Sequence, residues 1–555
     1  MKKWVVLDKS KTAEIDDLVK IILKNRGIKS QREIENFLYP SLDELTIDSA
    51  KISLSELRKA CLRIKKAVAE NESIIVYTDY DVDGICGGAI VWETIYKFYK
   101  RIMPYVPDRK KEGYGLSKKG IDFVKKEHNA SLIITVDHGI SGREDIAYAK
   151  NLGVETIVID HHLLPRKLPD AVAIIHTTAL SAGAIAWFFA NYLIEQFKIH
   201  SAKSGLENLD LACLSTIADL IPLTGLNRII TKYGLAEINK TKRLGLSILI
   251  KEAGLKKGEI GVYEVGHILA PRINAAGRID HALDALRLIC AKDEEKATLL
   301  ARRLSIINRE RQALTVKYAF FAAEIVRSKK LEKLIVVQHE SFNEGVIGLI
   351  AGKLVDEFYR PAIVIAKGEE YSKASARSIS GFNIVENIRK AAHLLESVGG
   401  HPMAAGFTVA TKNIEILEKE LRNIVEKELD VSKLEKELKI DLEITLSSVT
   451  EKLFEKLSQL SPFGVGNPQP VFVSRNVKIV SASLLGRDKK HLKLVVSRNP
   501  EERNDVIKAI GFDMGSMFYR ILPGSLVDIA YTIDEDKWNG ERGLQLKLKD
   551  VKLRD

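Results

Sequence analysis

Residues 74–84 read Ile74-Ile75-Val76-Tyr77-Thr78-Asp79-Tyr80-Asp81-Val82-Asp83-Gly84, a run of apolar and β-branched residues followed at once by acids and a glycine. A short apolar run bounded by turn-forming residues is typical of a strand that is buried on both faces. A helical pattern follows from Ile85 to about Tyr99. The segment therefore predicts a strand that carries carboxylates to the edge of a sheet.

Three further apolar runs repeat this pattern: Leu132–Val136, Thr156–Ile159 and Ala171–Ile175. A helix-like segment near 143–152 separates the first two of them. Strands that alternate with helices and lack a polar face favour a parallel sheet with helices on both sides. We expect an α/β fold for this part of the chain.

Acids and histidines also follow two of these runs. One run ends in Asp137-His138-Gly139 and the next in Asp160-His161-His162, while Asp219 ends a separate apolar, helical stretch. Ligands of open parallel sheets bind beyond the carboxyl ends of the strands. We therefore expect these side chains to meet at one rim of the sheet.

Such a cluster needs cations, because neighbouring carboxylates repel each other unless a positive charge neutralises them. Oxygen and imidazole ligands suit Mn²⁺ or Mg²⁺, and two such ions about 4 Å apart can bind a phosphate and activate water. A lone Asp-x-Asp is usually a solvated turn or a helix cap. Acids at three strand ends instead favour a two-metal phosphoesterase.

Composition sets wider limits. The four cysteines (Cys61, Cys86, Cys213 and Cys290) lie far apart, which argues against a zinc site or a disulfide framework. The net charge of +11 fits either a Lys- and Glu-rich surface or attraction to polyphosphate, and charge alone does not separate the two. No apolar run approaches the roughly 20 residues of a membrane helix, and the apolar stretch near Met1 is too short for a signal peptide. We expect a cytoplasmic protein with no membrane contact.

Changes in pattern divide the chain into five parts. These are an N-terminal helical segment (1–70), a first α/β domain (71–281), a helical connector (282–330), a second α/β domain (331–429) and a small β-barrel (430–555).

The acidic segments Asp79–Gly84, Asp137 and Asp160-His161-His162 resemble the DHH phosphoesterase superfamily. Further segments narrow the resemblance to RecJ-type single-strand-specific exonucleases and extend it over nearly the whole chain. They are Arg26–Ile28 with Phe37–Pro40, Pro107–Arg109 with Glu112–Leu116, Ala218–Leu223, Ala270–Arg278, Gly345–Ala351, Gly399–Phe407 and Pro462–Pro468.

This resemblance implies a site with two divalent ions, Mn²⁺ or Mg²⁺, in the first α/β domain, which would be the DHH domain. The implied metal ligands are Asp81, Asp83, Asp137, His161 and Asp219, with Asp137 as the bridge. Asp79 and Asp160 would orient ligands or water, and His162 would face the scissile phosphate. Water is then the nucleophile, so no Ser or Cys nucleophile is expected.

Residues that would hold the strand come from several segments. Guanidinium groups fit phosphate oxygens, although an Arg can also serve only to satisfy loop carbonyls. The second α/β domain resembles the DHH-associated (DHHA1) domain, where Gly-Gly-His allows close backbone approach but is often only a tight turn. The candidate substrate-binding residues are Arg109, Tyr114, Arg272, Asn274, Arg278, Arg377, Ser378, Gly400 and His401.

The last domain resembles an OB barrel (430–555). It offers aromatic residues for base stacking, although most aromatics in a small barrel belong to its core. The candidates are Phe472, Phe512, Tyr531 and Trp538, with Arg487, Lys489, Lys490 and Lys493 nearby in sequence.

Two positions depart from the family pattern. The chain reads His176-Thr177 where the family usually has Asn-Pro, which puts contacts beside the site in doubt. His138 stands where Asn is common in the family and could be a metal ligand or contact a phosphate, although a packed surface histidine is the favoured interpretation.

The resemblance implies a 5′→3′ exonuclease specific for single-stranded DNA, acting in recombination and repair. RNA stays open as a substrate, because nothing in the sequence reads the 2′-hydroxyl. One rival is a DHH-type oligoribonuclease or cyclic-dinucleotide phosphodiesterase, which has no need of the barrel. Another is a non-catalytic replication-fork scaffold, which should have lost ligands. A single-strand-binding protein or a helicase is a candidate partner, and we expect a monomer.

Overall fold

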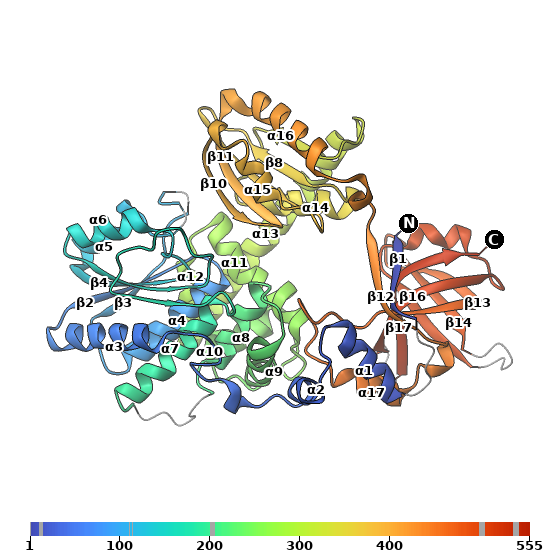
Figure 1. Ribbon diagram of the computed structural model, residues 1–555, viewed down its shortest axis with the longest axis horizontal. Helices are drawn as coiled ribbons and strands as arrows, with labels where there is room; N and C mark the ends of the chain where they lie inside the picture. Colours follow the sequence, from blue (N-terminus) through green and yellow to red (C-terminus); the bar gives the residue numbers. More distant parts are fainter. Residues whose placement is uncertain are drawn as a thin grey trace. The chain divides into compact units, whose positions relative to one another are not determined.

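The computed structural model describes residues 2–9, 15–109, 111–113, 115–199, 206–498, 505–536 and 543–554. The chain forms two compact units (Figure 1). One comprises residues 1–49, 220–233 and 437–555, and the other comprises residues 50–219 and 234–436. Among the described residues, no helix is both long and apolar enough to cross a membrane.

The larger unit begins with the expected parallel sheet. Its strands lie in the order β3-β2-β4-β5-β6 and are parallel throughout. Their bounds are β2 Ser73–Thr78, β3 Ile102–Tyr105, β4 Ala130–Val136, β5 Glu155–Asp160 and β6 Ala173–His176. The four predicted strands are confirmed. The short edge strand β3 was missed because its four residues include a proline and carry little pattern of their own.

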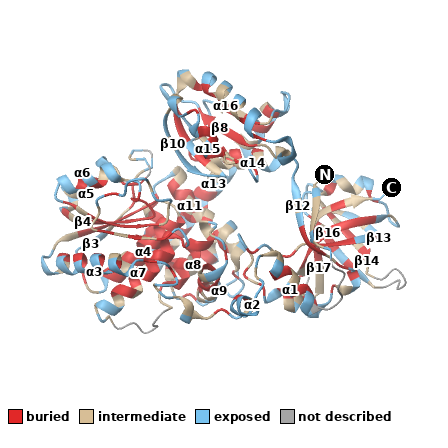
Figure 2. Cartoon of the chain, in the orientation of Figure 1, coloured by how far each residue is buried: buried red, intermediate tan, exposed pale blue. Residues whose placement is uncertain are grey.

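Helices cover both faces of this sheet (Figure 1). On one side lie α5 (Lys118–His128) and α6 (Arg143–Asn151), and on the other lie α3 (Leu54–Ala69), α4 (Val82–Tyr96), α7 (Ala182–Gln196) and α8 (Leu209–Ala218). Helices α4 and α7 are buried almost all round (Figure 2), as their lack of a polar face requires.

The same unit continues through a helical region into a second sheet. The helices are α10 (Leu244–Glu252), the π-helical turn η2 (Glu264–Leu269), α11 (Ala270–Ile279), α12 (Leu283–Ile289) and the long α13 (Glu294–Arg327). The second sheet has the order β10-β11-β9-β8-β7, in which only β7 and β8 run parallel. Its elements are β7 Ile335–His339, α14 Ile347–Phe358, β8 Ala362–Ala366, β9 Tyr371–Arg377, α15 Ile384–Arg389, β10 Leu395–His401, β11 Ala404–Ala410 and α16 Ile414–Glu428.

The smaller unit contains the expected barrel. Five strands close through the pairing of β13 with β16, and β12 and β1 extend the sheet beyond β13. The bounds are β1 Lys3–Asp8, β12 Glu437–Glu443, α17 Glu451–Ser458, β13 Phe472–Leu485, β14 His491–Ser497, β15 Val506–Gly511, β16 Leu526–Asp536 and β17 Gly543–Leu553. The α/β fold class with a C-terminal OB-like barrel is confirmed.

The expectation of a purely helical N-terminal segment is wrong. Residues Lys3–Asp8 form strand β1, which pairs in parallel with β12. Helices α1 (Ile15–Asn25) and α2 (Gln31–Leu38) then pack their apolar residues, among them Leu18 and Ile22, into the barrel core. The strand was missed because its partner lies more than 400 residues later, beyond the range of any local pattern.

A buried arginine joins the N-terminal helices to the barrel unit. Arg228 is 1% exposed and donates to the carbonyls of Phe37 (2.8 Å), Leu460 (2.9 Å) and Ser461 (2.7 Å). Since buried charges need several partners, these carbonyls are what allows the Arg228 guanidinium to be buried. Arg26 likewise donates to Asn467, so the first and last motifs of the family resemblance meet here.

Candidate metal centre

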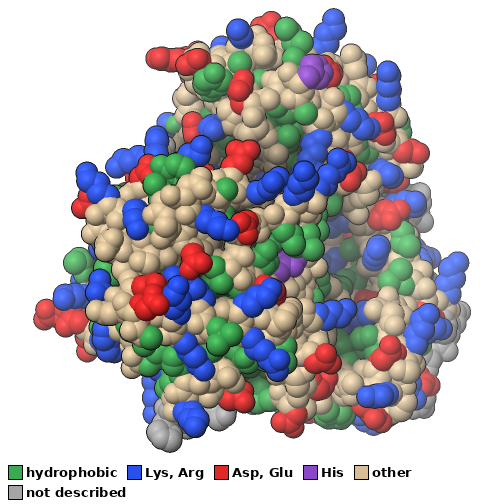
Figure 3. Space-filling model, turned by 60° about the vertical axis from the view of Figure 1, so that its left-hand side comes forward, with side chains coloured by type: hydrophobic (Ala, Val, Ile, Leu, Met, Phe, Trp, Pro, Cys, Tyr) green, Lys and Arg blue, Asp and Glu red, His purple; other side chains and the backbone are tan. Residues whose placement is uncertain are grey.

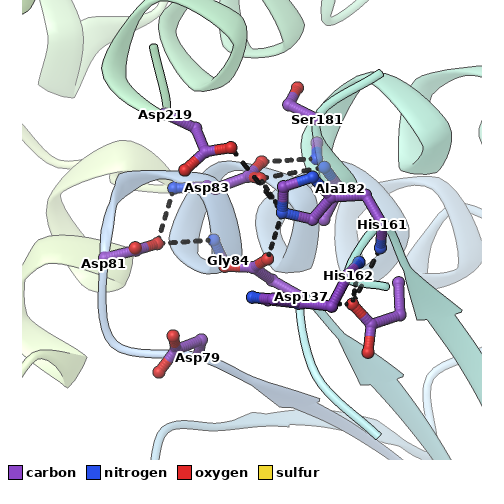
Figure 4. A network of polar contacts seen from close by, with 12 residues as sticks. Asp79, Asp81, Asp83, Gly84, Asp137, His161, His162, Ser181, Ala182 and Asp219 are labelled. Atoms are coloured by element: carbon purple, nitrogen blue, oxygen red, sulfur yellow. Dashed lines mark hydrogen bonds and ion pairs between the residues drawn. The ribbon is translucent and has the colours of Figure 1, made fainter. Parts of the chain in front are cut away.

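The carboxyl ends of β2, β4 and β5 bring the acidic segments to one edge of the parallel sheet (Figure 4). Asp81 is the N-cap of α4, where its side chain accepts from the backbone N–H groups of Asp83 (2.9 Å) and Gly84 (3.1 Å). A Cβ on Gly84 would lie 2.6 Å from the carbonyl oxygen of Asp79. The loop therefore requires both the capping aspartate and the glycine.

Asp83 points from α4 toward the start of α7. It is 2% exposed and accepts from the backbone N–H groups of Ala182 (2.9 Å) and Gly183 (2.7 Å). The hydroxyl of Ser215 also donates to it. A helix N-terminus stabilises a carboxylate, so these donors hold the Asp83 side chain in one orientation.

His161 lies among three of the aspartates (Figure 4). Its Nε2 is 3.2 Å from Oδ1 of Asp137 and 3.6 Å from both Oδ2 of Asp83 and Oδ2 of Asp219. Three sets of possible metal ligands occur here, each with its donor atoms within 4.8 Å of one another. The sets are Asp137/His161/His162, Asp83/His161/Asp219 and Asp79/Asp81/Asp137. Asp137 belongs to two of them.

The carboxylates of this cluster repel one another. Burial, reinforced by the neighbouring acids, raises the pKa of Asp137 and of Asp79 well above the usual range and also raises the pKa of Asp81. The same causes raise the pKa of Asp219 to about 8. Divalent cations would relieve this repulsion, and the oxygen and imidazole donors suit Mn²⁺ or Mg²⁺. The residues present therefore fit two such ions.

Asp160 is arranged differently from the other acids. Its Oδ1 accepts from the backbone N–H of His161 (2.7 Å) and from Nδ1 of His162 (2.7 Å), and its Oδ2 accepts from the N–H of Ile140 (2.9 Å). Although burial opposes ionisation, these donors and the His162 charge lower the pKa of Asp160 to about 2. Burial likewise opposes protonation of His162, but Asp160 raises the pKa of His162 overall. Asp160 thus orients the His162 ring.

Four guanidinium groups gather beside the acidic loop. Burial and the nearby charges of Arg109, Arg311 and Arg377 lower the pKa of Arg278 to about 10. Arg109 also lies over the ring of Tyr80, 5.2 Å from its centroid. Arg311 was not among the residues predicted from the sequence, because Arg309-Glu310-Arg311 resembles the charged, solvated face of a long helix.

Three other candidate substrate-binding residues make contacts within the protein. Oδ1 of Asn274 accepts from the backbone N–H of Val82 (2.9 Å), so this side chain supports the acidic loop. Arg272 donates to the carbonyl of Ile268 (2.7 Å) in the π-helical turn. Ser378 is 5% exposed, and its hydroxyl donates to the carbonyl of Phe382 (2.6 Å). These contacts tie the three side chains to the protein, and their predicted role in binding substrate stays a prediction.

The Gly-Gly-His segment reaches the metal centre from the second sheet. Gly400 has φ +138°, and a Cβ there would lie 2.3 Å from the carbonyl oxygen of Ala404, so the position requires glycine. His401 stacks on His162 with ring centroids 5.9 Å apart. Burial and the two histidines of the centre lower the pKa of His401. Tyr114 lies outside the described residues, so its role in binding substrate stays a prediction.

His138 is a core residue. It is 2% exposed, and its Nε2 lies 3.0 Å from the carbonyl oxygen of Tyr77. Burial lowers the pKa of His138 to about 4, so the ring is neutral at pH 7. The expectation of a surface position for this histidine is wrong, because it packs edge-on against the Tyr77 ring beneath the sheet edge.

The barrel aromatics divide into core and surface residues. Phe472 and Tyr531 are fully buried and lie 6.3 Å apart in the barrel core, so they are not available for base stacking. Phe512 is 56% exposed beside His491. Trp538 lies outside the described residues. Figure 3 shows Lys and Arg side chains spread over the visible face with acids among them, rather than gathered in one patch.

The chain matches three family descriptions. Residues 73–218 match the DHH family, N-terminal domain, residues 331–427 match the DHHA1 domain, and residues 440–550 match the RecJ OB domain.

Individual proteins match almost the whole chain. The single-stranded-DNA-specific exonuclease RecJ of Bacillus subtilis (strain 168) is 36% identical over 549 residues, covering 97% of this chain and 68% of that protein. The protein of the same name from Salmonella typhimurium is 29% identical, with 97% and 96% covered. The crystal structure of RecJ in complex with Mn²⁺ from Thermus thermophilus superposes with a TM-score of 0.82 at 26% identity, covering 100% of this chain and 80% of that one.

Proposed function

The chain belongs to the RecJ family of single-stranded-DNA-specific exonucleases, and we propose that it degrades a DNA strand from the 5′ end with two divalent metal ions. It is a metal-dependent hydrolase of single-stranded DNA. The observation that carries the proposal is the convergence of five aspartates and two histidines at one sheet edge. A non-catalytic scaffold would not be expected to keep such a complete and mutually repulsive set of acids.

The proposed ligands are Asp81, Asp83, Asp137, His161 and Asp219, which would hold the two ions. Asp137 would lie between them, since a carboxylate has two oxygens to offer. When bound, Mn²⁺ or Mg²⁺ ions supply Lewis acidity to the scissile phosphate and to water. The protein prepares this site before any cation arrives. Asp83 is fixed by the N-terminus of α7, and Asp81 by the N-terminus of α4.

Other groups act on the substrate itself. Asp160 orients His162 and favours its protonated form, which can donate a hydrogen bond to a phosphate oxygen. We propose that Arg109, Arg278 and Arg377, joined by Arg311, bind the 5′-terminal phosphate. Holding the terminal phosphate would place the first phosphodiester bond at the acids. That arrangement gives 5′→3′ polarity and release of mononucleotides.

The main rival is a DHH-type oligoribonuclease or cyclic-dinucleotide phosphodiesterase. It would share the acidic rim but not the terminal barrel, which matches the RecJ OB domain here. The domain limits given above stay predictions, as do a single-strand-binding protein or helicase partner, a monomeric state and a cytoplasmic location.

The test is digestion of 5′- and 3′-labelled single-stranded DNA, duplex DNA and RNA with Mn²⁺, Mg²⁺ or EDTA. Each strand is supplied with either a 5′-phosphate or a 5′-hydroxyl. We expect a 5′ label on phosphorylated single-stranded DNA to appear first as mononucleotide, and EDTA to stop the reaction. Early release of the 3′ label would refute the polarity, and faster digestion of RNA dinucleotides than of long DNA would favour the rival.

A further inference from the structure

The last residue of the edge strand β6, His176, contacts the segment Asp160–His162 directly. His176 is paired with Asp160 in the β5–β6 register, so it lies beside the acid that orients His162. Its Nε2 is 2.7 Å from the carbonyl oxygen of His162. Because a carbonyl can only accept, His176 must carry a hydrogen on Nε2 and donate it.

An exposed loop begins directly after His162. His161 and His162 are held by Asp160, but the residues that follow are exposed: Leu163 is 71%, Leu164 58% and Leu168 50% exposed. The chain returns from this loop as β6, which ends at His176. The hydrogen bond from His176 to His162 therefore ties the two ends of the loop together.

Hydrogen bonds thus restrain both the ring and the backbone of His162, whose N–H also donates to Oδ1 of Asp160 (3.1 Å). Asp160 bonds the Nδ1 of its ring, and His176 bonds its carbonyl oxygen. The chain then enters α7, whose first N–H groups hold Asp83. The family usually has Asn at this position. In this chain, His176 lies between the segment that carries His162 and the helix that holds Asp83.

We propose that His176 is a positioning residue, whose Nε2–H fixes the backbone of His162 and so keeps the His162 imidazole aimed at the scissile phosphate. The proposal rests on the proposed catalytic role of His162. Side chains that orient a functional group typically change activity by about 10- to 100-fold when removed. The loss should fall on kcat rather than on KM, because His176 is not itself placed to contact the DNA.

Three variants separate the hydrogen bond from the ring. The amide nitrogen of Gln lies near the place of histidine Nε2, whereas that of Asn lies near Nδ1 and does not reach the carbonyl; Phe keeps the ring without a donor. We expect His176→Gln to retain activity within about threefold, and His176→Asn and His176→Phe to lose on the order of tenfold in kcat with KM for single-stranded DNA unchanged. Activity equal to that of the wild type in both His176→Asn and His176→Phe would overturn the proposal.

Two further measurements distinguish positioning from a structural role. Hydrogen exchange of the amides of residues 163–170 should speed up in His176→Phe and His176→Asn but not in His176→Gln, and this readout does not depend on catalysis. In a double-mutant cycle, adding His176→Phe to His162→Ala should cost nothing more. Additive losses, or unchanged exchange, would refute the proposal. If His162→Ala alone were fully active, the proposed role of His162 would fail instead, whatever His176 does.

Discussion

Asp137→Asn is the sharpest test of the metal centre, because it should raise stability and remove activity at the same time. The donor atoms of Asp79 and Asp81 lie within 4.8 Å of the Asp137 carboxylate. At that distance each pair of unit charges repels by about 3.5 kcal/mol at an effective dielectric constant of about 20. Proton uptake by these acids relieves part of the repulsion, so we expect the metal-free variant to be about 2 kcal/mol more stable than the wild type.

This gain corresponds to a rise of about 4–8 °C in the melting temperature of a domain of this size. The assay is thermal unfolding in EDTA and in Mn²⁺, paired with digestion of end-labelled single-stranded DNA. In Mn²⁺ the wild type should gain much more than the variant, and the variant should lose about 10³-fold or more in rate, since Lewis-acid stabilisation is worth several kcal/mol. The control is Glu127→Gln, which makes the same charge change at an exposed position on α5. The reasoning would be refuted if Asp137→Asn and the wild type melted at the same temperature in EDTA, or if the variant digested DNA at the rate of the wild type.

Three more results are expected. The pKa of Asp219 is raised to about 8, so its contribution to the stability of the metal-free protein is complete below about pH 4 and is lost as the pH rises through 8. Apparent Mn²⁺ affinity, measured by calorimetry, should accordingly rise from pH 6 to 8 and then level off; affinity independent of pH would contradict this. Asn274→Ala removes the acceptor for the Val82 N–H, so kcat and Mn²⁺ half-saturation should worsen by about tenfold without a change in KM; a rise in KM alone would mean that Asn274 binds substrate. Phe512→Ala should weaken binding of long single strands by about 1–3 kcal/mol with little change in melting temperature, whereas Phe472→Ala should destabilise the barrel by about 3–5 kcal/mol; the reverse pattern in binding and melting assays would show the two assignments to be wrong.

Local patterns were enough to predict the catalytic sheet. The buried run that ends at Asp79 has no polar face, so it could only be a strand covered on both sides. Once the strands are parallel, their carboxyl ends have to share one edge, which brings Asp137 and His161 together. Asp219 drew attention because it follows a largely apolar helical stretch, and the structure shows that helix α8 is buried throughout most of its length.

The contacts that several of these residues make within the protein were not predicted from the sequence. Asn274 and Ser378 belong to motifs that suggest substrate contact, yet their side chains bond to the protein backbone. Arg311 looks solvated in the sequence but lies near Arg278. Strand β1 was not predicted, because the strand with which it pairs, β12, lies far away in the sequence.

The sequence by itself thus determined the parallel sheet, the acids at its edge and the need for cations, since these follow from hydrophobic periodicity and from the repulsion of like charges. Only the tertiary structure decided which polar groups bond to the protein itself and so hold the site in place. A hydrogen bond satisfies its donor wherever the acceptor lies along the chain. The position of a polar residue in the sequence therefore says little about whether its partner is a phosphate or a carbonyl such as that of His162.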